Sequence, residues 1–301
     1  MPRLLLPLLL ALLALSPARQ AAAQATKQAP GIQGQVLDAK TRQPVPYASL
    51  SLLNEHNWTL ANATGHFELA GVKKSGNDML LIEGPGYLPR SVVLHNRALT
   101  DTTLTLDKAA KAPKVQPANS AQVVIRRLGS LAKKPGEGMI QGLMGSQFAL
   151  FMEPSPKHQV GSVRNVSFFI GDTGFPKESF RVRIYRADGP NHSPGTNLLA
   201  ENLIVAAPGG GQWFTVDIAP YAVEVPREGF YVGMEWIVAH EPTAFQDNYT
   251  PFGQVLRPTF EFKESMTWTF AVGNGWHLLP LRNAASRAYN AMIRAEIEEL
   301  Q

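Results

Sequence analysis

Cysteine is absent from this 301-residue sequence. Its absence excludes disulfide bonds, thiolate ligands for a metal ion and cysteine nucleophiles. It also excludes the lipid-modified cysteine that anchors a bacterial lipoprotein. The mature chain is therefore expected to carry no lipid anchor of that kind.

Strong net charge and long apolar runs are also lacking. The chain has 28 basic residues against 24 acidic ones. Loss of Arg3 and Arg19 with an export signal would leave 26 against 24, a net charge of +2, which is too balanced to indicate nucleic acid as a partner. The apolar run from Leu4 to Leu15 has 12 residues, whereas a membrane-spanning helix needs about 20. We expect no transmembrane span in the mature chain.

The N-terminus has the pattern of a secretory signal peptide. Arg3 gives a positive start, an apolar stretch follows, and Ala21-Ala22-Ala23 offers a small-residue cleavage site. Residues 1–23 are predicted to be removed, which predicts an exported protein in the periplasm, at the outer membrane or in the medium. The mature length of about 275 residues fits one large domain or two ordinary ones.

Strand and turn signals alternate from Gly34 to Leu106. Asn62 and Gly65 can supply turn conformations, and Phe67 begins an alternating pattern. The predicted strand regions are Gly34–Leu53, Ala61–Leu69, Asp78–Leu94 and Thr100–Leu106.

This stretch resembles the carboxypeptidase regulatory-like domain, found on many secreted and outer-membrane proteins of Gram-negative bacteria. The matching residues are Gly34, Pro46-Tyr47-Ala48, Thr64-Gly65-His66-Phe67 and Gly86-Tyr87. The family usually has aspartate where this chain has Asn62. The resemblance implies a seven-stranded, transthyretin-like sandwich over residues 32–106 that acts as a non-catalytic accessory module. It supplies no counterpart of the zinc ligands of true carboxypeptidases.

The composition and the apolar periodicity of the sequence change after residue 106, which divides the chain into two parts. Residues 107–121 contain alanine, lysine and two prolines without apolar periodicity, and they are predicted to be a linker. From residue 122 to 301, about eight to ten short alternating segments predict a jelly-roll-like antiparallel β-sandwich, loosely similar to carbohydrate-binding modules. The clearest segments are Ser162–Ile170, Ser179–Ala187, Asn197–Ala206, Gln212–Ile218, Gly229–Ala239, Thr259–Lys263, Thr267–Val272 and Ala291–Leu300.

The last of these segments is ambiguous. Alanine, glutamate, methionine and leucine favour a helix by propensity. Met292, Arg294 and Glu296 alternate with Ile293, Ala295 and Ile297, so we expect a closing strand. The whole chain is thus predicted to be all-β.

Alternation also assigns faces to two strands. Phe180, Val182 and Ile184 are expected to point to one side, and Arg181, Arg183 and Tyr185 to the other. The second set is either a basic and aromatic patch suited to an acidic glycan or a solvated face whose long side chains cover apolar surface. We favour the solvated face. In the second strand, Phe230, Val232, Met234, Trp236 and Val238 are expected to form sandwich core.

No motif of catalysis or metal binding is present, so we expect no catalytic residue, no metal and no cofactor. None of the seven histidines pairs with another at zinc-helix spacing, and no serine lies in a nucleophile elbow. Paired carboxylates remain open, because glycosidase acids lie far apart in sequence. The available ones are Asp188, Asp217, Glu235, Glu241 and Asp247.

The segment from His240 to Pro258 is the best candidate site, because antiparallel connections are usually far shorter. Aromatic rings stand there among amide and carboxylate groups, the chemistry of glycan or peptide recognition. These residues are Phe245, Asp247, Asn248, Tyr249 and Phe252. The alternative is a lid that buries its own rings. Two further segments are candidates: Ala187–Asn197, which could border the same end, and Gly273–Tyr289 with Trp276 and His277.

We therefore expect an exported, non-enzymatic protein with a binding or structural role, with glycan or peptide recognition assigned to the second domain. Two alternatives remain. One is a glycan hydrolase that uses carboxylates of the larger sandwich. The other is a structural partner of an outer-membrane complex.

Overall fold

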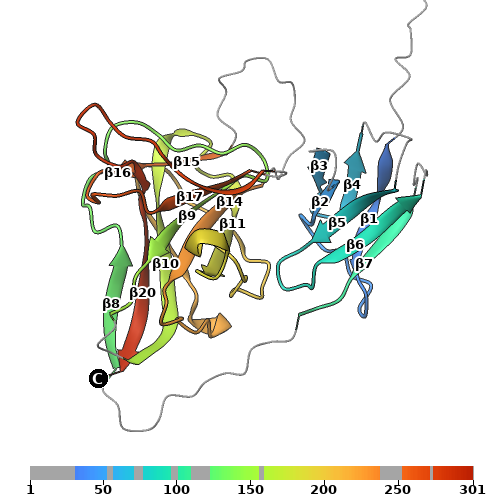
Figure 1. Cartoon of the computed structure of the whole chain (residues 1–301), viewed down its shortest axis with the longest axis horizontal. Helices are drawn as coiled ribbons and strands as arrows, with labels where there is room; N and C mark the ends of the chain where they lie inside the picture. The colour runs from blue at the N-terminus through green and yellow to red at the C-terminus, as the bar shows by residue number, and fades with distance from the viewer. Residues whose placement is uncertain are drawn as a thin grey trace, which may run out of the picture.

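The computed structural model describes residues 31–52, 57–70, 77–95, 101–109, 123–155, 159–237, 253–271 and 274–300. The described chain forms strands, with two short 3-10 turns, η1 (Pro190–His192) and η2 (Ala219–Tyr221). The prediction of an all-β protein is confirmed (Figure 1). Within the described ranges, no helix has the length and apolar character needed to cross a bilayer.

The N-terminal unit pairs two sheets and confirms the predicted seven-stranded sandwich. One sheet has the order β4-β1-β7, in which β1 and β7 run parallel. The other has the order β3-β2-β5-β6. Their bounds are β1 Ile32–Asp38, β2 Ser49–Leu52, β3 Asn57–Leu60, β4 His66–Leu69, β5 Asn77–Glu83, β6 Arg90–His95 and β7 Thr102–Leu106. Apolar side chains of both sheets form the core, among them Val36, Leu50, Leu80, Ile82 and Leu106.

The turn before β4 shows why asparagine can replace the usual aspartate. The Asn62 side-chain oxygen accepts hydrogen bonds from the backbone N–H groups of Thr64 and His66, at 2.9 and 3.0 Å. Gly65 has φ +76° there, and a Cβ would lie 2.6 Å from the Val36 carbonyl oxygen. An amide oxygen therefore caps this turn as a carboxylate would, and the position after Thr64 requires glycine.

The chain stays hydrogen-bonded to this unit beyond β7. Tyr87 and Lys108 form an antiparallel bridge, and the Ala109 N–H donates to the Gly86 carbonyl at 2.9 Å. Residues 110–122, which make up most of the predicted linker, lie outside the described residues. The limits of the linker stay a prediction.

The second unit is a larger antiparallel sandwich, as predicted. Its first sheet has the order β13-β10-β20-β8, with β15 also paired to β10. The bounds are β8 Val123–Gly129, β10 Gln159–Gly174, β13 Gln212–Asp217, β15 Gln254–Leu256 and β20 Ile293–Leu300. Its second sheet has the order β12-β11-β14-β9-β17-β18. The bounds are β9 Gln147–Met152, β11 Ser179–Arg186, β12 Ile204–Ala206, β14 Phe230–Trp236, β17 Thr267–Ala271 and β18 Gly275–Leu278. A short pair joins β16 (Pro258–Thr259) to β19 (Asn290–Ala291).

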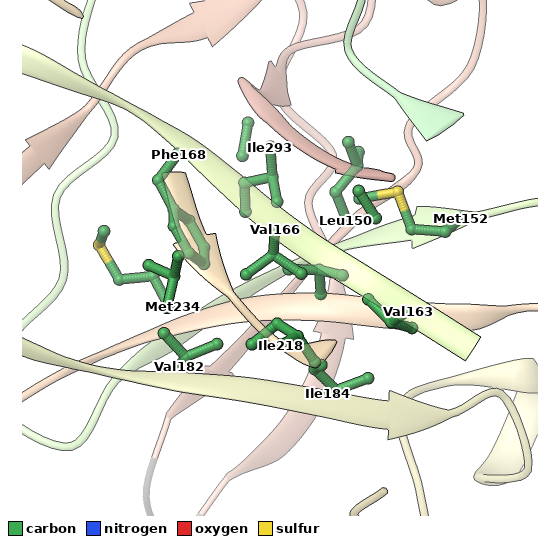
Figure 2. Packing of buried hydrophobic residues seen from close by; sticks show 14 of the residues in the cluster. Leu150, Met152, Val163, Val166, Phe168, Val182, Ile184, Ile218, Met234 and Ile293 are labelled. Atoms are coloured by element: carbon green, nitrogen blue, oxygen red, sulfur yellow. The ribbon is translucent and has the colours of Figure 1, made fainter. Parts of the chain in front are cut away.

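The core of this sandwich lies between its two sheets (Figure 2). Val166 and Phe168 of β10 face Val182 and Ile184 of β11, with Met234 of β14 beside them. Phe230, Val232, Met234 and Trp236 are all buried in this cluster, as alternation predicts for one face of a strand. Val238 lies outside the described residues.

Two predicted strands are longer than those of the structure. Of residues 259–263 only Thr259 lies in a strand, β16 (Pro258–Thr259), and of residues 197–206 only Ile204–Ala206 do. Between residues 197 and 203 the chain still follows β11, because the Leu198 N–H donates to the Ile184 carbonyl, but the pairing is irregular. β8 and β9 were not anticipated. The closing strand is confirmed as β20.

Candidate functional site

Buried charged side chains and aromatic rings of the second unit lie together on the six-stranded sheet, on the face turned away from the core. On this face, Arg181 lies opposite Glu235, and Glu235 lies opposite Gln147, in one row across β11, β14 and β9. A second row runs Tyr185, Tyr231 and Phe151 across the same strands. We call these two rows, with the side chains that pack on them, the outer face.

Two arginines share one carboxylate in the first row. Arg181 Nη1 lies 2.8 Å from Glu235 Oε1, and Arg183 Nε lies 2.6 Å from Glu235 Oε2. The side chains are only 1% (Arg181), 3% (Glu235) and 13% (Arg183) exposed. The expectation of a solvated or exposed basic face is therefore wrong for these residues. They form a buried ion cluster, because other parts of the chain cover this side of the sheet.

The electrostatics of the cluster keep all three groups charged at neutral pH. Burial by itself would raise the pKa of Glu235, but the two neighbouring guanidinium groups hold that pKa below its usual value. Burial lowers the pKa of Arg181 to about 10, against the opposing effect of Glu235. Charges removed from water must be paired to be tolerated. Glu235 is thus the counter-ion that allows both arginines to be buried.

Aromatic rings surround the second row. Tyr185 and Tyr231 are buried, and Phe151, Trp268 and Trp276 are half-buried against them. The ring centroids of Tyr185 and Trp276 are 5.5 Å apart, and those of Phe270 and Trp276 are 5.3 Å apart. The face therefore carries a group of neighbouring rings in edge-to-face or tilted contact, which we call the aromatic cluster: Phe151, Tyr185, Tyr231, Trp268, Phe270 and Trp276.

Both tyrosines of the aromatic cluster are fixed by hydrogen bonds. Tyr185 donates its hydroxyl to Gln147 Oε1 at 2.6 Å, and Tyr231 donates to the His192 carbonyl at 2.6 Å. Burial raises the pKa of each hydroxyl to about 12. Both hydroxyl groups therefore stay protonated and act as hydrogen-bond donors at physiological pH, so these two hydrogen bonds do not change with pH in that range.

The predicted residues Phe245, Asp247, Asn248, Tyr249 and Phe252 lie outside the described residues. The other two candidate segments are brought together: Tyr231 binds His192 of the segment Ala187–Asn197, and Trp276 packs on Tyr185. Ala187–Asn197 follows β11 at the end where Arg186 pairs with Phe230, and β14 ends where Phe180 pairs with Trp236, at the other end of this strand pair. Residues 238–252 of the long segment lie outside the described residues, so the expectation that the two segments border the same end stays a prediction.

The remaining predicted groups have local structural roles. His277 is exposed, and its Nε2 lies 2.8 Å from the Asn274 carbonyl oxygen. Asp188 accepts hydrogen bonds from the Thr196 backbone and hydroxyl at 2.7 and 2.6 Å. Asp217 accepts one from the Ala219 N–H at 3.1 Å. These two carboxylates stabilise turns. Glu241 and Asp247 lie outside the described residues.

Sequence reasoning missed the role of Glu235 and the rings of Phe151, Tyr231 and Trp268. A signal for the ion cluster was present: Glu235 is the acid inside an otherwise apolar strand, and β11 carries arginines at alternate positions. Opposite charges on neighbouring strands indicate a cross-strand pair. Among the described residues, no three His, Asp or Glu side chains lie close enough together to hold a metal ion.

The paired sheets of the N-terminal unit define the class of this part of the chain as a transthyretin-like β-sandwich. Residues 31–112 match the family described as the carboxypeptidase regulatory-like domain, which confirms the resemblance drawn from the sequence. No curated protein matches the chain. Among solved structures, the major pilin subunit BcpA of Bacillus cereus is similar over 91% of this chain and 69% of that chain, at 11% identity and a TM-score of 0.19.

Proposed function

We propose that this protein is a non-catalytic, exported binding protein whose second sandwich recognises a glycan through the aromatic cluster. The observation that carries the proposal is the set of half-buried rings on the outer face of a sheet, Phe151, Trp268, Phe270 and Trp276. The outer side of an antiparallel sheet ordinarily faces water with polar side chains. Rings in that position offer stacking area at low entropy cost.

A polar group next to the rings supports a hydroxyl-rich ligand over a purely apolar one. Arg183 lies on the same face with 13% of its side chain exposed, and its planar guanidinium group is held by Glu235. Sites for small polar ligands combine aromatic walls with a few fixed polar groups. Contacts from Phe245, Asp247, Asn248, Tyr249 and Phe252 remain a prediction beside this proposal, as does the alternative role as partner of an outer-membrane complex.

The state of Glu235 supports binding over hydrolysis. Both carboxylate oxygens are taken by guanidinium groups, and the pKa lies below its usual value. A glycosidase acid needs a raised pKa, and its nucleophile needs a free oxygen. Glu235 meets neither requirement. Asp188 and Asp217 are held in turns, so they do not replace it.

Substitution of Trp276 tests the proposal. A glycan array with the full chain identifies the ligand, and calorimetry then compares the wild type with Trp276→Ala. Loss of a stacking anchor is expected to cost about 2 kcal/mol, or about thirtyfold in affinity. The matched control is Trp213→Ala. Trp213 is also half-buried, but it lies on the other sheet, where the Arg294 guanidinium carbon is 3.9 Å from the centre of the Trp213 ring. Loss of the Trp213 side chain should leave the affinity for the glycan unchanged.

The opposite result is equally clear. If Trp276 serves only as packing, truncation lowers the melting temperature of the second sandwich while affinity for any array ligand stays at the wild-type value. An array on which a peptide binds and no glycan does would move the ligand class from glycan to peptide.

A further inference from the structure

Two successive backbone carbonyls of the N-terminal sandwich contact side chains of the second sandwich. Arg181 Nη2 donates to the Tyr47 carbonyl at 2.7 Å, and Asn202 Nδ2 donates to the Pro46 carbonyl at 3.0 Å. Arg181 is fully buried. The two residues of the first hydrogen bond are 134 positions apart in the sequence, and those of the second are 156 apart.

The backbone of Tyr47 helps to present these carbonyls. Tyr47 has φ +54°, a left-handed conformation that non-glycine residues adopt only where their surroundings enforce it. The Arg181 guanidinium carbon also lies 6.0 Å from the centre of the Tyr47 ring, within the range of a cation–π contact. One residue therefore offers Arg181 both a carbonyl and a ring.

The charge of the ion cluster explains why these contacts matter. Within the second sandwich, Arg181 and Arg183 share the single carboxylate of Glu235, so the buried cluster has one excess positive charge. The N-terminal sandwich supplies groups that offset it: the Tyr47 carbonyl, which accepts a hydrogen bond from Arg181, and the Tyr47 ring, which lies near the Arg181 guanidinium. A buried excess charge is costly unless polar groups replace water around it.

Gly86 provides a third contact between the two sandwiches. It has φ +77°, and a Cβ at this position would lie 1.7 Å from the Ala200 carbonyl oxygen of the second sandwich. The backbones approach so closely there that no side chain fits between them. Tyr47 and Gly86 both belong to the motif residues by which the N-terminal domain resembles its family.

We propose that the carboxypeptidase regulatory-like domain docks on the second sandwich in one fixed orientation, with Arg181 as the anchor and the Pro46–Tyr47 carbonyls and Gly86 as its complement. Domains joined by a linker ordinarily move relative to each other unless their interface resists it. Here a buried guanidinium requires the interface for its own solvation. The partner for this surface of the N-terminal domain is thus the second sandwich of the same chain.

Distance measurement between two spin labels tests fixed docking in the full chain. Because the sequence has no cysteine, Glu68→Cys and Arg164→Cys introduce the only two labelling sites; both wild-type residues are exposed, one in each sandwich. The expected result is a single narrow distance distribution. With Arg181→Gln added, the narrow peak should be lost, while Arg183 still pairs with Glu235.

Matched variants separate docking from general damage. Arg186→Gln removes an arginine of the same strand whose partner is the exposed Glu228, and it should keep the narrow peak. Gly86→Ala should abolish that peak, whereas Gly275→Ala, with a similar φ of +76° and no atom within 4 Å of the added Cβ, should keep it. A broad distribution in the wild type, or a narrow one retained in both Arg181→Gln and Gly86→Ala, would overturn fixed docking.

Discussion

At the scale of single residues, Glu235 holds together the buried ion cluster of the second sandwich. It is buried and forms ion pairs with two guanidinium groups. Its pKa in the folded protein lies below the ordinary value of 4.5. The unfolded chain therefore binds this proton at a higher pH than the folded chain does. The contribution of Glu235 to the free energy of unfolding is therefore fully present at a pH above its ordinary pKa. This contribution is lost as the pH falls towards the lower pKa that Glu235 has in the folded protein.

Glu235→Gln is expected to lower the free energy of unfolding by about 3–5 kcal/mol at neutral pH, because it leaves two buried arginines without a counter-ion. The variant should also lack the part of the acid-induced loss of stability that the wild type shows below pH 4.5. Denaturant unfolding at several pH values measures both effects. The control Glu228→Gln breaks an ion pair that is 41% and 45% exposed, and should cost at most about 1 kcal/mol. Equal costs for the two variants would contradict the role of Glu235.

The same residues show what sequence alone could and could not predict. Period-two alternation placed Arg181, Arg183 and Tyr185 on the side opposite the core, and the structure agrees. Their burial was not predictable from the strand itself, because the covering groups are Tyr47, far upstream, and Trp276, far downstream. Local pattern determines the face of a strand, whereas long-range packing determines whether that face meets water.

At the scale of elements, the strands that sequence predicted best are those with one apolar side. β20 is one of them: Ile293, Ala295 and Ile297 are fully buried, and Arg294, Glu296 and Glu298 alternate with them. β8 was missed because its pattern is weak, with Val123 and Ile125 exposed at 44% and 41%. It is held instead by pairing with β20, including Arg127 to Glu296 at 2.6 Å. Such pairing depends on a distant part of the sequence, because Arg127 and Glu296 are 169 positions apart.

A matched pair of substitutions in β20 tests the assigned faces. Ile297→Ala removes a fully buried side chain between two strands and should cost about 2–5 kcal/mol of stability. Glu298→Ala, one residue further along, changes the outward face and should stay within about 1 kcal/mol. Thermal or chemical unfolding measures the difference. Similar costs at the two positions would mean that the period of two does not hold in this strand.

At the scale of the whole molecule, the segment that connects the two sandwiches, residues 110–122, lies outside the described residues. The described chain stays paired as far as Ala109, and it is paired again from Val123 in β8. Between them the sequence has no apolar periodicity and contains Lys111 and Lys114. Fixed docking through Arg181 uses residues of the two sandwiches only, so it is independent of how this connecting segment is arranged.

Limited digestion with trypsin is expected to cut first after Lys111 and Lys114. Lys108, Arg126 and Arg127 flank these sites but lie in paired backbone, which resists proteases because the chain must open locally to be cut. Mass spectrometry should find one fragment that ends at residue 111 or 114 and a second that begins there, each with β-type circular dichroism. A variant with both lysines changed to glutamine should survive much longer. First cuts within Ser162–Ala239 would show that the predicted domain limits are wrong.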